Sequence, residues 1–366
     1  MKNFFKKTCV SVLVIGSLTV LSFTAEPGGK GQVQKDLREY FRGLTDRGLF
    51  SGSVLVAREG NILYKEGLGL ADYDTGRVNT PTTVYAIASI SKAFTAVSIM
   101  ILEERGLLSV NDKLSDYMPD YPRGDEITIH QLLNMTAGIY NYAKNPGLRI
   151  SEYHSHEEML QYFMNEPMEH EPGTDWAYCN SCYFLLGMIV EQVSGMPYRD
   201  FLRVNIFEPL KMGHSGYDPD GFEFDNKKAV GYDCTQTLPP PVSITIHPTV
   251  TFSAGGIYST VTDMYKWHRS FQTEALLSRD SLDRIFTPGP GNYGYGWYIE
   301  SHEMAGQERE MIWHWGSYLG YHGFIAHLPA EDIFIFLQYN FTSPNPGYQY
   351  QALPYVKDAV EIILTH

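Results

Sequence analysis

The sequence is poor in cysteine, with four in 366 residues. They are Cys9, Cys179, Cys182 and Cys234, and three remain if the N-terminal segment is removed. Three cysteines exclude a small disulfide-rich framework, and the single CxxC at residues 179–182 has no second pair to complete a structural zinc site. One disulfide and one free thiol would suit an oxidising compartment, but the sequence does not select the pairing.

Long apolar runs are absent after the N-terminus. The segment Cys9–Phe23 is short and apolar, and it follows Lys2, Lys6 and Lys7. This pattern predicts an export signal over residues 1–25, and therefore a periplasmic or secreted protein. A retained membrane anchor is the alternative, although about 20 apolar residues are needed to span a bilayer.

Positive charge is also scarce. The formal net charge is −14, and it becomes −17 without the three lysines of the first 25 residues. Because no basic stripe offsets this charge, nucleic acid and anionic membranes are excluded as expected partners. A small-molecule or peptide substrate remains, with membrane contact only if the N-terminal segment is retained. The oligomeric state is not indicated.

Two hydrolase signatures are missing from the chain. There is no Gly-x-Ser-x-Gly elbow, which argues against an α/β-hydrolase, and no HExxH zinc motif. His154, His156, Glu157 and Glu158 lie close together but lack that spacing, so a solvated loop is favoured over a metal cluster. Neither a metal nor an organic cofactor is implied.

The hydrophobic pattern predicts strands at both ends of the chain and helices in its middle. A flexible leader at residues 28–32 and a helix at 35–47 precede a hairpin with its turn at Glu59-Gly60. Four strand-like runs then lie between 293 and 340, before a closing helix at 351–364. We therefore expect an α/β (α+β) fold, in which an antiparallel sheet is flanked by N- and C-terminal helices and a mostly helical lobe is inserted.

The helices expected in the middle of the chain are those at residues 90–105, 129–135, 157–163, 183–193 and 198–207, and another follows "FSAGGIYST". The α/β lobe would then cover about residues 33–88 and 265–366, with the helical lobe at about 89–264.

Ser89 and Lys92 open the long apolar helix predicted from Ile90. Serine is a preferred N-cap, so capping is one interpretation of Ser89. However, a lysine in the first helical turn opposes the helix dipole, and a spacing of three places both side chains on one face. A lysine whose pKa is lowered by burial can accept the proton of a nucleophilic serine.

Two further motifs offer matching chemistry. Tyr178-Cys179-Asn180 pairs a phenol, as a proton relay, with an amide that can orient a substrate, although a capping Asn beside a packing tyrosine is the structural alternative. His314-Trp315-Gly316 lies between two strong strand patterns, where the glycine would let a substrate backbone approach closely. The Ser317 N–H could then join the Ser89 N–H as an oxyanion hole.

Taken in this order, Ser89-x-x-Lys92, Tyr178-x-Asn180 and His314-x-Gly316 resemble the serine β-lactamase and penicillin-binding-protein superfamily. The variant is similar to the class C-like branch, which includes D-peptidases and esterases. Connecting stretches such as "ITIHQLLNMTAGI" and "SAGGIYSTVTDM" carry the resemblance over nearly all of residues 37–364.

The resemblance implies a role for each matched residue. Ser89 would be the acylated nucleophile, and Lys92 and Tyr178 would share its proton. Asn180 would hold the substrate amide. The remaining matched residues would form the far wall and the second oxyanion donor: His314, Gly316 and the Ser317 N–H.

Three departures from the family pattern narrow the expected activity. His314 stands where true β-lactamases have lysine, so recognition of a substrate carboxylate should be weaker or pH-dependent. Cys179 stands where serine is common, which would place a thiol near the nucleophile, and Trp315 would narrow the cleft.

We therefore predict a serine hydrolase domain over residues 26–366. It would act on amide or ester bonds as a D-amino-acid peptidase or esterase, with weak β-lactamase activity at most. The alternative is a non-catalytic receptor for D-amino-acid peptides.

Overall fold

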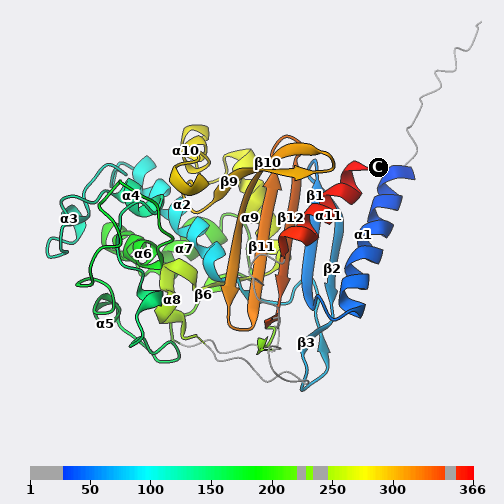
Figure 1. The fold of residues 1–366 in the computed structure, drawn as a ribbon, viewed down its shortest axis with the longest axis horizontal. Helices are drawn as coiled ribbons and strands as arrows, with labels where there is room; N and C mark the ends of the chain where they lie inside the picture. The colour runs from blue at the N-terminus through cyan, green and yellow to red at the C-terminus, as the bar shows by residue number, and fades with distance from the viewer. Residues whose placement is uncertain (1–27, 221–227, 234–245, 343–351) are drawn as a thin grey trace, which may run out of the picture.

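The computed structural model describes residues 28–220, 228–233, 246–342 and 352–366 (Figure 1). The predicted export signal and Cys234 lie outside the described residues, as does most of the proline-rich stretch before Pro248. None of the described helices is long and apolar enough to cross a membrane.

A six-stranded antiparallel sheet forms the centre of the molecule, as predicted. Its order is β2-β1-β12-β11-β10-β9, so the first hairpin of the chain joins the last four long strands through the β1–β12 pairing. The strands are β1 (Gly52–Arg58), β2 (Asn61–Leu68), β9 (Tyr298–Met304), β10 (Gln307–Tyr318), β11 (Tyr321–Leu328) and β12 (Ile333–Tyr339).

The two terminal helices cover one face of this sheet. Helix α1 (Gly28–Asp46) packs on β2 and on α11 (Ala352–Leu364), which crosses β9, β11 and β12 (Figure 1). The predicted flexible leader at residues 28–32 is wrong, because these residues form the first turns of α1. Packing of the apolar stripe of α1, which includes the buried Leu37 and Phe41, outweighs the low helix propensity of the glycines.

The opposite face carries α9 (Val261–Thr273), which packs on β1 and β12, and beyond it the helical part of the chain. The other helices are α2 (Ser91–Glu104), α3 (Leu114–Tyr117), α4 (Ile129–Leu133), α5 (His156–Leu160), α6 (Asn180–Ser194), α7 (Tyr198–Leu202), α8 (Pro248–Gly255) and α10 (Arg279–Ile285). Short helical turns are η1 (Ala88–Ile90), η2 (Tyr142–Lys144), η3 (Arg203–Phe207) and η4 (Pro290–Asn292).

Several short strands form smaller sheets. They are β3 (Leu70–Asp72), β4 (Arg77–Val78), β5 (Tyr85–Ala86), β6 (Gly216–Tyr217), β7 (Tyr232–Asp233), β8 (Ile257–Ser259) and β13 (Phe341–Thr342). The small sheet β5-β8-β6 brings together segments more than a hundred residues apart, immediately before η1 and immediately after α8. The lobe boundaries near residues 88 and 265 stay predictions.

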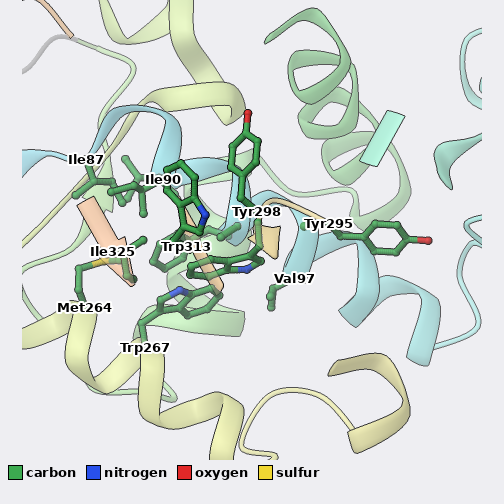
Figure 2. Close-up of a cluster of buried hydrophobic side chains, with 14 of the residues drawn as sticks. Ile87, Ile90, Val97, Met264, Trp267, Tyr295, Tyr298, Trp313 and Ile325 are labelled. Atoms are coloured by element: carbon green, nitrogen blue, oxygen red, sulfur yellow. The ribbon is translucent and has the colours of Figure 1, made fainter. Parts of the chain in front are cut away.

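A buried aromatic and aliphatic core joins the sheet to α2 and α9. Figure 2 shows Ile87 and Ile90 beside the side chains of β10 and β11, with Met264 and Trp267 of α9 on the other side. The Trp267 ring stacks on Phe94 of α2 at a centroid distance of 3.9 Å. This core therefore holds the N-terminal end of α2 against the sheet.

Replacing Trp267 with alanine should destabilise the protein by about 3–5 kcal/mol, because Trp267 is fully buried and its removal leaves a cavity between α9 and α2. Urea unfolding followed by circular dichroism measures this loss. The matched control is Val78→Ala, at a side chain that is 59% exposed, which should change the free energy of unfolding by less than about 0.5 kcal/mol. Equal midpoints for the two variants would contradict the packing described here.

Candidate active site

Ser89 lies in the single turn η1, immediately before α2. The N-cap of α2 is Ile90, which makes no side-chain capping hydrogen bond, and the N-cap of η1 is Ile87. The interpretation of Ser89 as a helix cap is therefore wrong. Its hydroxyl is instead directed to Lys92, whose Nζ lies 3.2 Å from the Ser89 Oγ.

The backbone immediately before Ser89 is strained. Ala88 has a φ of +48°, which is unfavourable for a residue with a Cβ. The turn is held by its surroundings, because the Ile87 N–H donates to the Ile257 carbonyl at 3.0 Å and the Ile90 N–H donates to the Ile87 carbonyl at 3.2 Å. Tertiary contacts thus position Ser89 more tightly than its local sequence does.

Lys92 is completely buried within the first turn of α2. Its Nζ donates to the Ala254 carbonyl at 2.7 Å and lies 4.9 Å from the centroid of the Tyr178 ring. Burial lowers the pKa of Lys92 well below its ordinary value, as the sequence analysis predicted. Lys92 is therefore held where a neutral amine can accept a proton from the Ser89 hydroxyl.

The carbonyl that binds Lys92 comes from a segment that the sequence analysis did not assign to the site. Helix α8 is interrupted at Phe252, which has a φ of +38° and a ψ of −126°. The adjacent Ser253 carbonyl accepts from Thr95 Oγ1 at 2.7 Å, and the Ile257 N–H donates to Ser91 Oγ at 3.1 Å. This segment contains "SAGGIYS", which is part of the stretch that carries the family resemblance. Its turn and strand form hydrogen bonds with α2.

Tyr178 lies directly before α6, with its hydroxyl group buried. That hydroxyl makes no hydrogen bond among the described residues, but the nearby Ser89 hydroxyl influences its pKa. Burial raises the pKa of Tyr178 strongly, and the interaction with Ser89 opposes that rise. The neighbouring loop supports the backbone here, because Asn141 Nδ2 donates to the Tyr178 carbonyl at 2.9 Å.

Asn180 is the first residue of α6 and is half-buried. Its side-chain amide has no hydrogen-bond partner among the described residues, whereas the N-cap role belongs to Cys179. The alternative interpretation of Asn180 as a helix cap is therefore wrong. The Asn180 amide stays available for a substrate group.

Cys179 does not carry a free thiol. It forms a disulfide with Cys182, one turn further along α6, and is itself buried. The predicted thiol beside the nucleophile is therefore wrong, because one helical turn brings the two sulfur atoms together. The bond joins the Tyr178–Asn180 stretch to the first turn of α6.

His314 is fully buried on β10 rather than exposed as a cation. Its Nδ1 lies 2.6 Å from the Trp315 carbonyl, and its Nε2 lies 3.1 Å from the Tyr293 hydroxyl. Because a carbonyl only accepts, Nδ1 donates to it and Nε2 accepts from Tyr293. Burial, and to a smaller extent Lys92, lowers the pKa of His314 to about 3. Of the two expectations for recognition of a substrate carboxylate, a neutral ring favours weaker recognition over pH-dependent recognition.

Gly316 brings β10 against the turn that carries Ser89. A Cβ at Gly316 would lie 2.1 Å from the Ile87 carbonyl oxygen, so only glycine fits without displacement of η1. We predicted that a glycine is needed at residue 316 because a substrate backbone approaches it. In the structure the protein's own backbone at Ile87 makes this approach.

Ser317 follows on the same strand, opposite His322 of β11. Its hydroxyl lies 3.1 Å from His322 Nδ1. The pairing of β10 with β9 ends at Trp313, so in the described part of the chain the later residues of β10 pair with β11 alone. This open edge lies next to η1, and the role of the Ser317 N–H as an oxyanion donor stays a prediction.

Aromatic side chains line the site beside Tyr178. The half-buried Trp315 stacks on Tyr178 at a centroid distance of 5.8 Å and on Tyr298 at 5.1 Å. Trp315 therefore lies beside the Tyr178 ring, and its place at the cleft stays a prediction.

An antiparallel sheet with a helical region on one face, and a Ser-x-x-Lys pair where the two meet, is the architecture of the β-lactamase and penicillin-binding class of proteins. The comparisons agree, because the sequence model of the family described as Beta-lactamase matches residues 37–357. The chain belongs to this family.

Individual relatives support the same assignment. PbpX of Bacillus subtilis is 32% identical over 255 residues, which cover 68% of this chain and 62% of PbpX. The chain thus spans less than two thirds of the length of that relative.

Two solved structures are similar in fold. The octameric penicillin-binding protein homologue from Pyrococcus abyssi has a TM-score of 0.73 at 28% identity, covering 89% of this chain and 78% of that chain. The D-amino acid amidase from Ochrobactrum anthropi SV3, complexed with L-phenylalanine amide, has a TM-score of 0.79 at 21% identity, covering 92% and 99%. At that identity the amidase supports the fold alone.

A pH-dependent difference in stability should follow from the buried lysine. The pKa of Lys92 is lowered in the folded state, so the unfolded chain binds more protons between that value and about pH 10.4. The free energy of unfolding of the wild type should therefore rise with pH in this window, relative to Lys92→Met, by at most about 1.4 kcal/mol per pH unit. Urea unfolding of both proteins from pH 7 to 10 tests this. Parallel curves would mean that Lys92 keeps its ordinary pKa.

Substituting Gly316 with alanine should displace η1, because the added Cβ would overlap the Ile87 carbonyl. We expect acylation of Ser89 by a fluorophosphonate to slow by about 100-fold, as for an active-site displacement near 1 Å. Gly213→Ala is the control, because a Cβ there meets nothing within 4 Å. Equal rates in the two variants would exclude the positioning role of Gly316.

Proposed function

We propose that this protein is a serine hydrolase that cleaves amide or ester bonds through an acyl-enzyme, with Ser89 as the nucleophile. The observation that supports this most directly is the position of Lys92. Its buried amine, with a strongly lowered pKa, lies 3.2 Å from the Ser89 hydroxyl. A base of this kind next to a serine is what nucleophilic catalysis requires.

In the proposed reaction, the Ser89 Oγ attacks the substrate carbonyl carbon while its proton passes to the Lys92 amine. The Ser89 and Ser317 N–H groups would stabilise the negative charge that develops on the carbonyl oxygen. The buried Tyr178 hydroxyl then relays the proton to the leaving amine or alcohol. The scissile bond breaks as this group is protonated and departs. Water then attacks the acyl carbon, and its proton passes through the same groups to the Ser89 Oγ. The ester bond to Ser89 breaks, and the acid is released.

The proposed substrates are uncharged at the position that faces His314. A buried imidazole with a pKa of about 3 remains neutral at physiological pH, so it offers no positive charge to a substrate carboxylate. The neighbouring Trp315–Tyr178 stack favours an apolar or aromatic group. Both observations favour D-amino-acid amides, peptides or esters over efficient hydrolysis of β-lactams, while Asn180 would orient the substrate amide.

We also propose that the protein is exported. The support is the lysine-rich N-terminus followed by the apolar segment Cys9–Phe23. A periplasmic or secreted location would give this site access to D-amino-acid peptides outside the cytoplasm, and it would keep the Cys179–Cys182 disulfide oxidised.

A three-substrate panel tests the reaction. Wild type and Ser89→Ala are assayed with p-nitrophenyl acyl esters, D-alanine p-nitroanilide and nitrocefin. We expect the wild type to hydrolyse the ester or the anilide faster than nitrocefin, and Ser89→Ala to lose at least about 1,000-fold in kcat/KM. Ser301→Ala, at an exposed serine on β9, is the matched control and should keep full activity.

The same proteins separate an enzyme from a non-catalytic receptor. Intact-mass measurement after treatment with a fluorophosphonate or a penicillin should show one adduct in the wild type and none in Ser89→Ala. A wild type that is never acylated would support the receptor alternative. Full ester hydrolysis by Ser89→Ala would exclude Ser89 as the nucleophile.

A further inference from the structure

A second group of chemically capable side chains lies on the face of the sheet that α9 covers. His268 belongs to α9, His327 is near the end of β11, and Asp332 lies in the turn between β11 and β12. One potential ligand atom from each residue lies within 4.8 Å of the other two. Three segments that are separate in sequence thus converge on one point.

One imidazole of this cluster lacks an ordinary hydrogen-bond partner. The Nε2 of His327 is buried without one, and the neighbouring ring of His268 is only 4% exposed. The ring centroids are 4.5 Å apart. Buried polar groups are nearly always paired, so an unpaired imidazole nitrogen beside a second buried imidazole points to a missing ligand.

The Asp332 carboxylate is held close to these rings. Its Oδ1 lies 3.9 Å from the His327 Nε2 and accepts from Gln272 Nε2 at 2.5 Å. The Arg269 guanidinium lies 3.9 Å from Oδ2. One carboxylate oxygen therefore faces the imidazoles, while the second is neutralised by a cation, as is common for a metal-binding carboxylate with supporting contacts.

The surroundings hold the three residues in place. The His268 ring stacks on Phe334 at a centroid distance of 4.3 Å. The Asp332 carbonyl accepts from the Glu59 N–H at 2.9 Å, which joins this turn to the β1–β2 turn. Burial also lowers the pKa of both histidines, so each offers a neutral nitrogen at physiological pH.

We propose that His268, His327 and Asp332 bind one divalent transition-metal ion of the zinc type. Two imidazoles and a carboxylate are a ligand set that zinc accepts, and water or the Gln272 carbonyl would complete the coordination. The site is separate from Ser89, because His327 lies four residues, or about 13 Å, along β11 from Gly323, the partner of Gly316. The metal would join α9 to the end of the sheet.

Calorimetric titration of the full chain with Zn²⁺ tests the site, and the visible spectrum with Co²⁺ reports its geometry. We expect one tightly bound ion per chain and a higher Tm in its presence. His268→Gln and His327→Gln should each lower the affinity by about 100-fold or more. The control is His302→Gln, at a half-buried histidine of β9 outside the cluster, which should leave the affinity unchanged.

A crystal of the wild type grown with zinc keeps the proposal falsifiable even if a variant fails to fold. Anomalous density between the three side chains would support the site. Its absence at saturating zinc, or an unchanged affinity in both folded histidine variants, would overturn the proposal. The test is independent of the hydrolase reaction, because neither histidine touches Ser89 or Lys92.

Discussion

The burial of Lys92 between the Ser89 hydroxyl and the Ala254 carbonyl is the constraint on which the site depends. Because the amine is enclosed in this way, with only neutral partners at hydrogen-bonding distance, burial lowers the pKa of Lys92 well below its ordinary value. The enclosure needs parts from the whole chain: α2 supplies the lysine, the interrupted α8 supplies the carbonyl, and α6 follows the tyrosine whose ring covers the amine. Each of these segments is in turn packed against the sheet or against a neighbouring helix.

The contact between Gly316 and the Ile87 carbonyl is a second constraint on the site. It sets the distance between β10 and the strained turn at Ala88, because no side chain separates the two backbones. The small sheet β5-β8-β6 also holds this turn in place, because it pairs the strand just before η1 with the strand just after α8. A turn with unfavourable backbone angles can persist when it is over-determined in this way.

The chemistry of the far wall follows from burial in the same manner. A histidine on an exposed strand would titrate near neutral pH, but His314 lies beneath Trp315 and receives a hydrogen bond from Tyr293, so it remains a neutral part of the wall. Membership of the β-lactamase family does not by itself specify which acyl substrate is used. The aromatic stack and the neutral imidazole are the features of this chain that favour uncharged amides or esters.

Periodicity alone was enough to predict the hairpin, the four late strands and the long helices, because these patterns reflect which faces are buried. The order of Ser89, Tyr178 and His314 along the chain was enough to predict the family. Local sequence could not predict the helical start of α1 or the break in α8, since each depends on packing against distant segments. It also did not select Cys179–Cys182 among the possible cysteine pairings. It also could not predict that His314 is buried and neutral, or that His268, His327 and Asp332 meet, because burial and convergence arise only when the chain is folded.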